Sequence, residues 1–238
     1  MAANRFLVVS FVMCGRKTLT RDMVSIIEDL SVEHWEVPDD YNGSYNIAPT
    51  QFSPVMINNN GRTVRNMRWG LVPSWAKDNS FAAKTINARI ETLREKPAFR
   101  NLVDRRRCVV LADGYYEWSS DKTPWYIYPK DNSLLLMAGL WDTWESNNEK
   151  LDTYTIITMP AISELADIHH RMPASLTVDS FAKWIGTSEH SYANLEPLLK
   201  KPEMKFSKHT VSKLVNSLNN NGPDCISPFY YPAQTQLF

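Results

Sequence analysis

Apolar side chains recur at helical intervals near the start of the chain and in short runs after it. Between residues 21 and 30 they lie three or four positions apart and form one face, made of Met23, Ile26, Ile27 and Leu30. This spacing predicts an amphipathic helix, for which Thr20 is a candidate N-cap. Apolar runs at 54–58 and 63–69 flank Asn59-Asn60-Gly61, a turn sequence that predicts a β-hairpin.

Most later apolar runs have the length of strands. We expect strands at 108–112, 124–129, 134–140, 153–159 and 205–211, and helices near 97–105, 163–167, 178–184 and 195–199. The strands do not alternate regularly with helices, which favours an antiparallel sheet or barrel. At 238 residues the chain has the length of one domain. The expected fold class is α+β: a single domain with a mainly antiparallel, barrel-like β core and flanking helices.

Charge is balanced over the whole chain but not along it. The formal net charge is zero, yet residues 62–107 contain twelve Lys or Arg against four Asp or Glu. Residues 113–190 contain five Lys or Arg against twelve Asp or Glu. This asymmetry predicts a cationic face suited to a polyanion. The alternative is that opposite charges interleave in space and form no such face.

The cysteines indicate free thiols in a reducing compartment. Cys14, Cys108 and Cys225 form no C-x-x-C pair and leave one cysteine unmatched. The sequence shows no metal-ligand spacing and no apolar run of transmembrane length. We therefore expect a cytoplasmic protein with no cofactor, no metal and no membrane association.

The residues before Cys14 allow three interpretations. Arg5 and the apolar run 6–12 resemble a short signal peptide before a lipidated cysteine, although Met13 is bulky where that cleavage requires a small residue. Alternatively, the run is a first strand. We favour a third interpretation, in which Met13 is the working start. The expected organisation is a leader or misassigned start at 1–13, a domain at 14–226 and a loose tail at 227–238.

Removal of Met13 would make Cys14 the first residue of the mature chain. It would then carry a free α-amine and a thiol two carbons apart. The amine condenses with an aldehyde to an imine, and the thiol closes onto the imine carbon to give a thiazolidine ring. A cysteine in this position is therefore a candidate covalent trap for an aldehyde. If Cys14 is internal, that chemistry fails unless the chain is cut before it.

Three other polar residues lie in apolar or turn-rich surroundings, namely Asn87, Glu117 and His169. A carboxylate buried between aromatic residues has a raised pKa and can move protons near neutral pH. Glu117 could therefore deprotonate the α-amine of Cys14, whose ordinary pKa is about 8. Structural interpretations stay open: Glu117 could pair with an arginine, His169 could cap a turn, and Cys14 could be a core thiol.

Aromatic and cationic residues supply candidate contacts to nucleic acid. Trp69, Pro73 and Trp75 could wedge or stack against bases. The alternative for the tryptophans is core packing. Phosphate groups could be held by Arg16, Arg89, Arg94 and Arg171.

Six motifs, in order along the chain, resemble one family. They are Cys14-Gly15-Arg16, the segment 45–50 (YNIAPT), the segment 69–73 (WGLVP), Asn87-Ala88-Arg89 with Glu91-Thr92, the segment 114–118 (GYYEW) and the segment 169–173 (HHRMP). Together they resemble the SRAP family, the SOS-response-associated peptidase-like proteins that sense abasic sites in DNA. The similarity spans residues 14–226.

The resemblance implies a β-barrel-like fold and covalent capture of abasic sites in single-stranded DNA by a mature N-terminal cysteine, as part of DNA repair and the SOS response. By position, it implies that Cys14 is the nucleophile, assisted by Asn87, Glu117 and His169. It implies DNA contacts from Arg89 and Arg171, and a place near the separated bases for Pro49 and Trp69. The expected partner is single-stranded DNA containing an abasic site, bound by a monomer that associates with the nucleoid.

The sequence departs from the family pattern at two points. Thirteen residues precede Cys14, and His170 stands where the family often has Asp, so two adjacent histidines compete for one role. We assign the role to His169 because of its spacing to Arg171-Met172-Pro173. Two other functions stay open: an N-terminal-nucleophile peptidase that removes its own leader, with weak lyase activity as a further expectation, and a non-covalent DNA binder.

Overall fold

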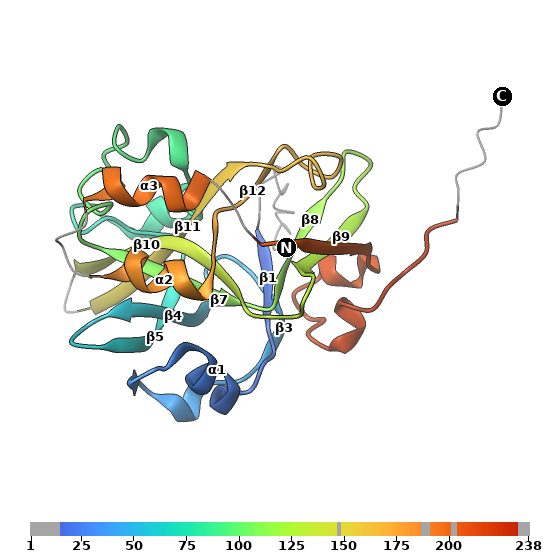
Figure 1. Cartoon of the computed structure of the whole chain (residues 1–238), viewed down its shortest axis with the longest axis horizontal. Coiled ribbons are helices and arrows are strands. Elements are labelled where there is room, and N and C mark those ends of the chain that lie inside the picture. Colours follow the sequence, from blue (N-terminus) through green and yellow to red (C-terminus); the bar gives the residue numbers. More distant parts are fainter. Residues whose placement is uncertain (1–14, 147–148, 187–190, 201–203, 233–238) are drawn as a thin grey trace, which may run out of the picture.

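A computed structural model describes residues 15–146, 149–186, 191–200 and 204–232. Figure 1 shows a β core with α2 and α3 on one side and α1 at the bottom of the view. This agrees with the expected α+β class. The three α-helices are α1 (Met23–Leu30), α2 (Val178–Ile185) and α3 (Tyr192–Lys200).

The larger sheet has the strand order β12-β11-β10-β7-β4-β5-β2. The bounds along it are β12 (Arg171–Pro173), β11 (Glu149–Pro160), β10 (Leu135–Ser146), β7 (Arg107–Ala112), β4 (Phe52–Asn58), β5 (Arg62–Trp69) and β2 (His34–Trp35). Two short strands lie beside this path: β13 (Ser175–Leu176) pairs with β10, and β6 (Asn87–Arg89) pairs with β11. A parallel pairing of β11 with β5 closes five of these strands into a barrel.

The smaller sheet has the order β14-β9-β8-β1-β3. Its strands are β14 (Phe206–Thr210), β9 (Pro124–Pro129), β8 (Gly114–Trp118), β1 (Arg16–Leu19) and β3 (Ser44–Ile47), and every neighbouring pair is antiparallel. Residues paired across an antiparallel ladder share a face, so Lys17, Tyr115 and Ile127 form one row. All three are buried, and this inner face packs toward the barrel.

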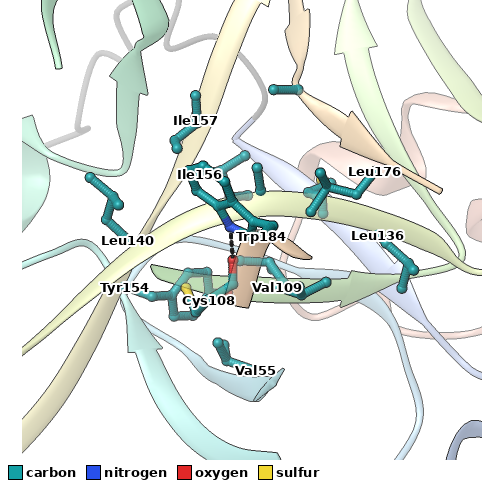
Figure 2. Packing of buried hydrophobic residues seen from close by; sticks show 14 of the residues in the cluster. Val55, Cys108, Val109, Leu136, Leu140, Tyr154, Ile156, Ile157, Leu176 and Trp184 are labelled. Carbon is teal, nitrogen blue, oxygen red and sulfur yellow. Dashed lines mark hydrogen bonds between the residues drawn. The ribbon is translucent and has the colours of Figure 1, made fainter. Parts of the chain in front are cut away.

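Strands β7, β10 and β11 supply much of the core, with buried residues that include Cys108, Val109, Leu140, Tyr154 and Ile156 (Figure 2). Helix α2 covers it. Trp184 of α2 is completely buried, and its Nε1 donates a 2.9 Å hydrogen bond to the carbonyl oxygen of Cys108 (Figure 2). This bond fixes the helix on the barrel because an indole N–H buried without an acceptor would cost free energy.

The outer face of the smaller sheet is covered by residues 211–226, here called the closing segment. Tyr116 and Tyr126 pack there against Val211, Val215 and Cys225. The segment contains two 3₁₀ turns, Lys213–Asn216 and Pro223–Cys225; the others described are Pro38–Asp40, Asn79–Lys84 and Ile90–Thr92. Both described cysteines, Cys108 and Cys225, are buried free thiols, as the sequence predicted.

Several predicted elements differ in detail. Helix α1 is capped by Asp22, whose carboxylate accepts from the backbone N–H of Ser25 at 2.9 Å, and not by Thr20. Thr20 instead donates its hydroxyl to Asp113. The predicted helices at 97–105 and 163–167 are successive turns that mix three- and four-residue hydrogen bonds. Among the described residues, no helix is long and apolar enough to cross a membrane.

Candidate functional site

Strand β1 joins the start of the described chain to the strand that carries Glu117. The register pairs Arg16 with Tyr116 and Lys17 with Tyr115. Cys14, the predicted nucleophile, lies outside the described residues, and Gly15 is the first residue that the structure describes. Gly15 therefore enters the fold beside the end of β8.

Glu117 lies in β8 with its side chain 4% exposed, on the inner face of the smaller sheet. It is paired with Trp125 of β9, so the two side chains share that face. One carboxylate oxygen accepts a 3.3 Å hydrogen bond from the backbone N–H of Trp118. Glu117 is thus buried beside an aromatic residue, as its local sequence predicted.

His169 is half-buried on the turn between β11 and β12. Its Nδ1 accepts a 3.1 Å hydrogen bond from the backbone N–H of Arg171. The same Nδ1 lies 3.4 Å from the carbonyl oxygen of Arg171, so the tautomer of the ring decides which of the two backbone groups it bonds. Burial lowers the pKa of His169 below its ordinary value, the backbone hydrogen bond to Arg171 opposes this, and the charges of His170 and Arg171 act in the same direction as burial. The lowered pKa favours the neutral ring.

The two histidines differ in environment. Their rings lie 4.3 Å apart between centroids, and His170 is exposed where His169 is half-buried. Only His169 has its Nδ1 fixed by a backbone N–H among the bonds described. This geometry favours His169 as the functional histidine of the pair.

Asn87 and Arg89 lie at the two ends of β6, which pairs with β11 through Ile156, Ile157 and Thr158. The middle residue of this three-residue strand, Ala88, is buried. Asn87 is half-buried, whereas Arg89 is exposed. Arg89 is therefore accessible to a phosphate group, and its predicted DNA contact stays a prediction.

Arg171 does not present its guanidinium to solvent. The side chain is 7% exposed and forms an ion pair with Glu91, with Nη1 2.6 Å and Nη2 3.0 Å from the two carboxylate oxygens. Nη2 also donates to the carbonyl oxygen of Thr158 at 2.6 Å. Arg171 ties the start of β12 to the segment after β6, and it lowers the pKa of Glu91 by donating to its carboxylate. Its predicted contact with the DNA backbone stays a prediction.

Two residues predicted to lie against bases are buried. Trp69 is completely buried, stacks on Tyr154 at 6.1 Å between ring centroids, and donates from Nε1 to the carbonyl oxygen of Ile86 at 2.9 Å. Pro73 is also buried. Trp69 therefore packs in the core, which is the alternative left open for the tryptophans. The predicted contacts of Trp69 and Pro73 with bases stay predictions. Pro49 is half-buried, and its predicted position near the bases stays a prediction.

Trp75 lies two residues after Pro73, and its aromatic side chain is exposed. Its side chain is 56% exposed and meets Phe81 edge-on at 5.5 Å between centroids. The loop around it is fixed by the hairpin of β10 and β11: Ser74 N–H donates to Asp142 at 2.8 Å, and Trp144 Nε1 donates to the carbonyl oxygen of Ala76 at 2.8 Å. A rigidly held, exposed indole is suited to stacking against a nucleobase.

Arg16 points to the face opposite Glu117, into the closing segment. Its guanidinium donates to Asn46 Oδ1 at 2.7 Å and to the carbonyl oxygens of Val215 at 2.5 Å and Asn216 at 3.3 Å. These three bonds leave other N–H donors of the guanidinium unused, and the predicted phosphate contact of Arg16 stays a prediction. Asn46 completes the connection by donating from Nδ2 to the carbonyl oxygens of Val215, Ser217 and Asn220.

A cavity of 580 Å³ lies where the segment after Glu117 meets the turn before His169. Its walls include Ser119, Thr123 and Trp125 on one side and Asp167 and Ile168 on the other. The cavity thus lies between the segments that follow Glu117 and precede His169. Sequence reasoning quoted Asn46 and Glu91 within motifs without giving them a role, and it missed Lys208, because the partners of all three are distant in the sequence.

The predicted cationic stretch is only partly available. Arg65 is bonded to Glu36 and Asp152, each at 2.8 Å, and Arg107 is buried with Nε donating to the carbonyl oxygen of Trp184. Exposed cations of the stretch are Lys77, Lys84, Arg89, Arg94, Lys96, Arg100 and Arg105. The described part of the chain contains no group of acidic, histidine or cysteine residues suited to a metal ion.

Comparison with known proteins identifies the family. A family profile described as SOS response associated peptidase (SRAP) matches residues 13–218. The chain belongs to the SRAP family. The match begins at Met13, directly before Cys14.

SRAP relatives of this chain are named for the same function. The chain is 38% identical over 221 residues to abasic site processing protein YoqW of Bacillus subtilis (strain 168), covering 90% of this chain and 99% of the relative. It is 34% identical over 279 residues to abasic site processing protein HMCES of Pongo abelii, covering 94% of this chain and 78% of the relative. Both relatives are named as proteins that process abasic sites.

Solved structures agree with the fold. A protein from Bacteroides thetaiotaomicron superimposes with a TM-score of 0.81 at 27% identity, covering 91% of this chain and all of the other. A protein from Bordetella bronchiseptica superimposes with a TM-score of 0.71 at 21% identity and shares the fold. The SRAP barrel with its second sheet is therefore the same architecture in all three.

Proposed function

We propose that this protein captures abasic sites in single-stranded DNA as a covalent thiazolidine adduct of Cys14. The observation that carries the proposal is the pairing of β1 with β8, in the register of Arg16 with Tyr116. This pairing supports the proposal because Arg16, two positions after Cys14 in the sequence, lies beside the strand that carries Glu117.

The chemistry balances without a cofactor. The abasic sugar opens to an aldehyde at C1′, and the α-amine of Cys14 attacks that carbon to give a carbinolamine. Loss of one water forms the imine. The thiolate of Cys14 then adds to the imine carbon, and the imine nitrogen takes up a proton to become the ring amine. The adduct has the combined mass of protein and DNA less one water.

The described residues have separate roles in this sequence. Glu117 takes a proton from the α-amine and returns protons as water leaves, a task suited to a buried carboxyl. His169 presents Nε2–H for proton transfer at the ring oxygen during ring opening. Asn87 holds the amine or the sugar in place. Ring closure competes with β-elimination from the imine, so the adduct protects the strand from cleavage.

Single-stranded DNA is the substrate form favoured by the available contacts. An abasic nucleotide has no base to unstack, so it enters a pocket at low cost. Trp75 supplies a stacking surface that tolerates any base, and Arg89 supplies an accessible cation. We assign these contacts to a cytoplasmic monomer that joins the nucleoid when it binds damaged DNA in the repair response.

The decisive measurement is intact mass. Protein beginning at Cys14 is incubated with a single-stranded oligonucleotide containing one abasic site, beside the same oligonucleotide with an intact base. We expect the protein mass to increase by that of the abasic oligonucleotide less one water. Cys14→Ala should retain imine formation, trapped by borohydride, and lose the stable adduct. A heat-stable adduct formed by Cys14→Ala would refute the assignment.

A second function has a specific observation behind it. The matching family profile is described as a peptidase, and thirteen residues precede Cys14. In this function the Cys14 thiol attacks the carbonyl carbon of residue 13, the peptide bond breaks to leave a thioester and a free α-amine, and water hydrolyses the thioester, with Glu117 moving the proton. Expression of the whole sequence followed by mass spectrometry tests this: loss of residues 1–13 that stops in Glu117→Gln and in Cys14→Ala supports it. The two activities are compatible, since cutting exposes the amine.

A further inference from the structure

Lys208 lies on the same face of the smaller sheet as Glu117. In β14 it is paired with Ile127 of β9, which is paired in turn with Tyr115 of β8. Trp125, two residues from Ile127, is the partner of Glu117, and the Lys208 ammonium lies 5.6 Å from the centroid of the Trp125 ring. Glu117, Trp125 and Lys208 therefore form a continuous surface on one sheet.

The same ammonium holds the turn that carries His169. Lys208 Nζ donates to Asp167 Oδ1 at 2.6 Å and Oδ2 at 2.8 Å, and to the carbonyl oxygen of Glu164 at 2.7 Å. Within the turn, the backbone N–H groups of Ile168 and His169 donate to the carbonyl oxygen of Leu165 at 3.0 and 3.2 Å. A movement of the turn at positions 164–167 would consequently move His169.

We propose that Lys208 is a positioning residue: it locks the His169 turn, which extends from the larger sheet, against the Glu117 face of the smaller sheet. The inference rests on the proposed function for the roles of Glu117 and His169. Glu117 belongs to the smaller sheet, whereas His169 lies on a turn of the larger sheet. A tie between the two sheets beside the cavity therefore holds these two groups in one relative geometry. Lys208 contacts both sides of that cavity, through Trp125 and through Asp167.

A direct role of Lys208 in binding phosphate is not favoured. An ammonium group has three N–H donors, and three acceptors already lie at 2.6–2.8 Å from Nζ. A large contribution to stability is not expected either, since the Asp167 side chain is 62% exposed and exposed ion pairs contribute little. The effect on reaction rate can be much larger than the effect on stability, because a small displacement of a reacting group can slow a reaction by about two orders of magnitude.

The experiment compares Lys208→Met, Lys208→Arg and Asp167→Asn with a matched control, Lys200→Met, which breaks a 3.1 Å surface ion pair with Glu196 on α3. Each protein begins at Cys14. Three quantities are measured: the first-order rate of adduct formation at saturating abasic DNA, the dissociation constant for an oligonucleotide without an abasic site, and Tm. The His169 ring signal is followed by NMR, assigned with His169→Ala.

We expect Lys208→Met and Asp167→Asn to slow adduct formation about tenfold and to shift the His169 ring signal, with the dissociation constant and Tm unchanged. Lys208→Arg should restore most of the rate, since a guanidinium can bond the same carboxylate. Lys200→Met should change none of these. In a His169→Ala background, Lys208→Met should have no further effect on the rate.

The outcomes separate the two proposals. An unmoved His169 signal in Lys208→Met, or a full tenfold loss that persists in the His169→Ala background, overturns the positioning role of Lys208. A parallel loss of DNA affinity also overturns it, because Lys208 would then be a binding residue. If the His169 signal shifts as expected and the unsubstituted protein forms no adduct, the tie is real and the proposed covalent function is wrong.

Discussion

Lys17 Nζ donates a 2.6 Å hydrogen bond to Ser53 Oγ across the boundary between the two sheets. Lys17 is completely buried and Ser53 is 1% exposed. The ammonium also donates to the carbonyl oxygen of Leu111 at 2.9 Å. Burial lowers the pKa of Lys17 to about 7, against the opposing influence of Asp113. A lysine that loses its charge near neutral pH thus lies three residues after Cys14.

The stability of the protein should therefore increase with pH above neutrality. The unfolded chain keeps Lys17 protonated up to its ordinary pKa of 10.5, whereas the folded chain releases the proton at about 7. Between these values the unfolded state binds more protons, so the free energy of unfolding rises by about 1.4 kcal/mol per pH unit from this group. Below pH 7 the full cost of burying the charge remains.

Lys17→Met removes that dependence. Denaturant unfolding of both proteins from pH 6 to pH 10 should show their stability difference moving in favour of the wild type above pH 7 and constant below it. Comparison of the two proteins cancels the titration of groups they share. A difference that stays flat across the whole range would mean that Lys17 keeps its charge in the fold.

Variants of Arg89 and Arg171 should differ in how strongly their DNA binding depends on salt concentration. Arg89→Gln is expected to weaken binding of single-stranded DNA and to reduce the salt slope by about 1, as loss of one phosphate contact does. Arg171→Gln should leave the slope unchanged and lower stability by roughly 1–3 kcal/mol, because Glu91 and the Thr158 carbonyl lose their donor. Titrations at several salt concentrations and denaturant unfolding measure both. A reduced salt slope in Arg171→Gln would show that this residue contacts a DNA phosphate.

Substitution of Trp69 should affect stability, whereas substitution of Trp75 should affect DNA binding. Trp75→Ala is expected to weaken DNA binding by about 1–3 kcal/mol with little change in Tm. Trp69→Ala should destabilise the fold by about 3–5 kcal/mol, because it empties a fully buried site. Phe52→Ala is the matched control, since Phe52 is a 57% exposed aromatic elsewhere. Equal loss of affinity in Phe52→Ala would show that Trp75 has no specific role.

Asn46→Ala should release the closing segment. The amide of Asn46 donates to three carbonyl oxygens of that segment, and Cys225 beneath it is 1% exposed. We expect Cys225 to react with a thiol reagent at least tenfold faster in this variant. Cys108 in the barrel is an internal control, because burial raises the pKa of its thiol and it should stay unreactive. Equal acceleration at both cysteines would indicate global unfolding.

Sequence patterns predicted helices and strands well where interactions between neighbouring residues determine the structure. The Asn59-Asn60-Gly61 hairpin formed as expected, with both Asn60 and Gly61 at positive φ as such turns require. Helix α2 also lies where its apolar spacing placed it. Residues 97–105 carry a helical pattern, yet no continuous helix forms, because the apolar side chains at 98, 99, 102 and 103 are buried by successive turns.

The partners of individual site residues could not be predicted, because they are distant in the sequence. An arginine is equally suited to a phosphate and to a carboxylate, and the carboxylate that Arg171 bonds belongs to Glu91, 80 positions away. Trp69 is buried through Tyr154 and Ile86, neither of which its local sequence indicates. The Lys208–Asp167 tie spans 41 positions between two sheets. Side-chain chemistry limits the options, and only the fold chooses among them.

The bonds of Arg16 also set an order of events during synthesis. Its guanidinium is held by carbonyl oxygens 199 and 200 positions further along the chain, and β1 pairs with a strand about 100 positions later. A nascent polypeptide still on the ribosome has made its first strand long before it has made these partners. The amino-terminal region therefore reaches its final surroundings only when translation is almost complete. Any capture chemistry at Cys14 is accordingly a property of the finished protein.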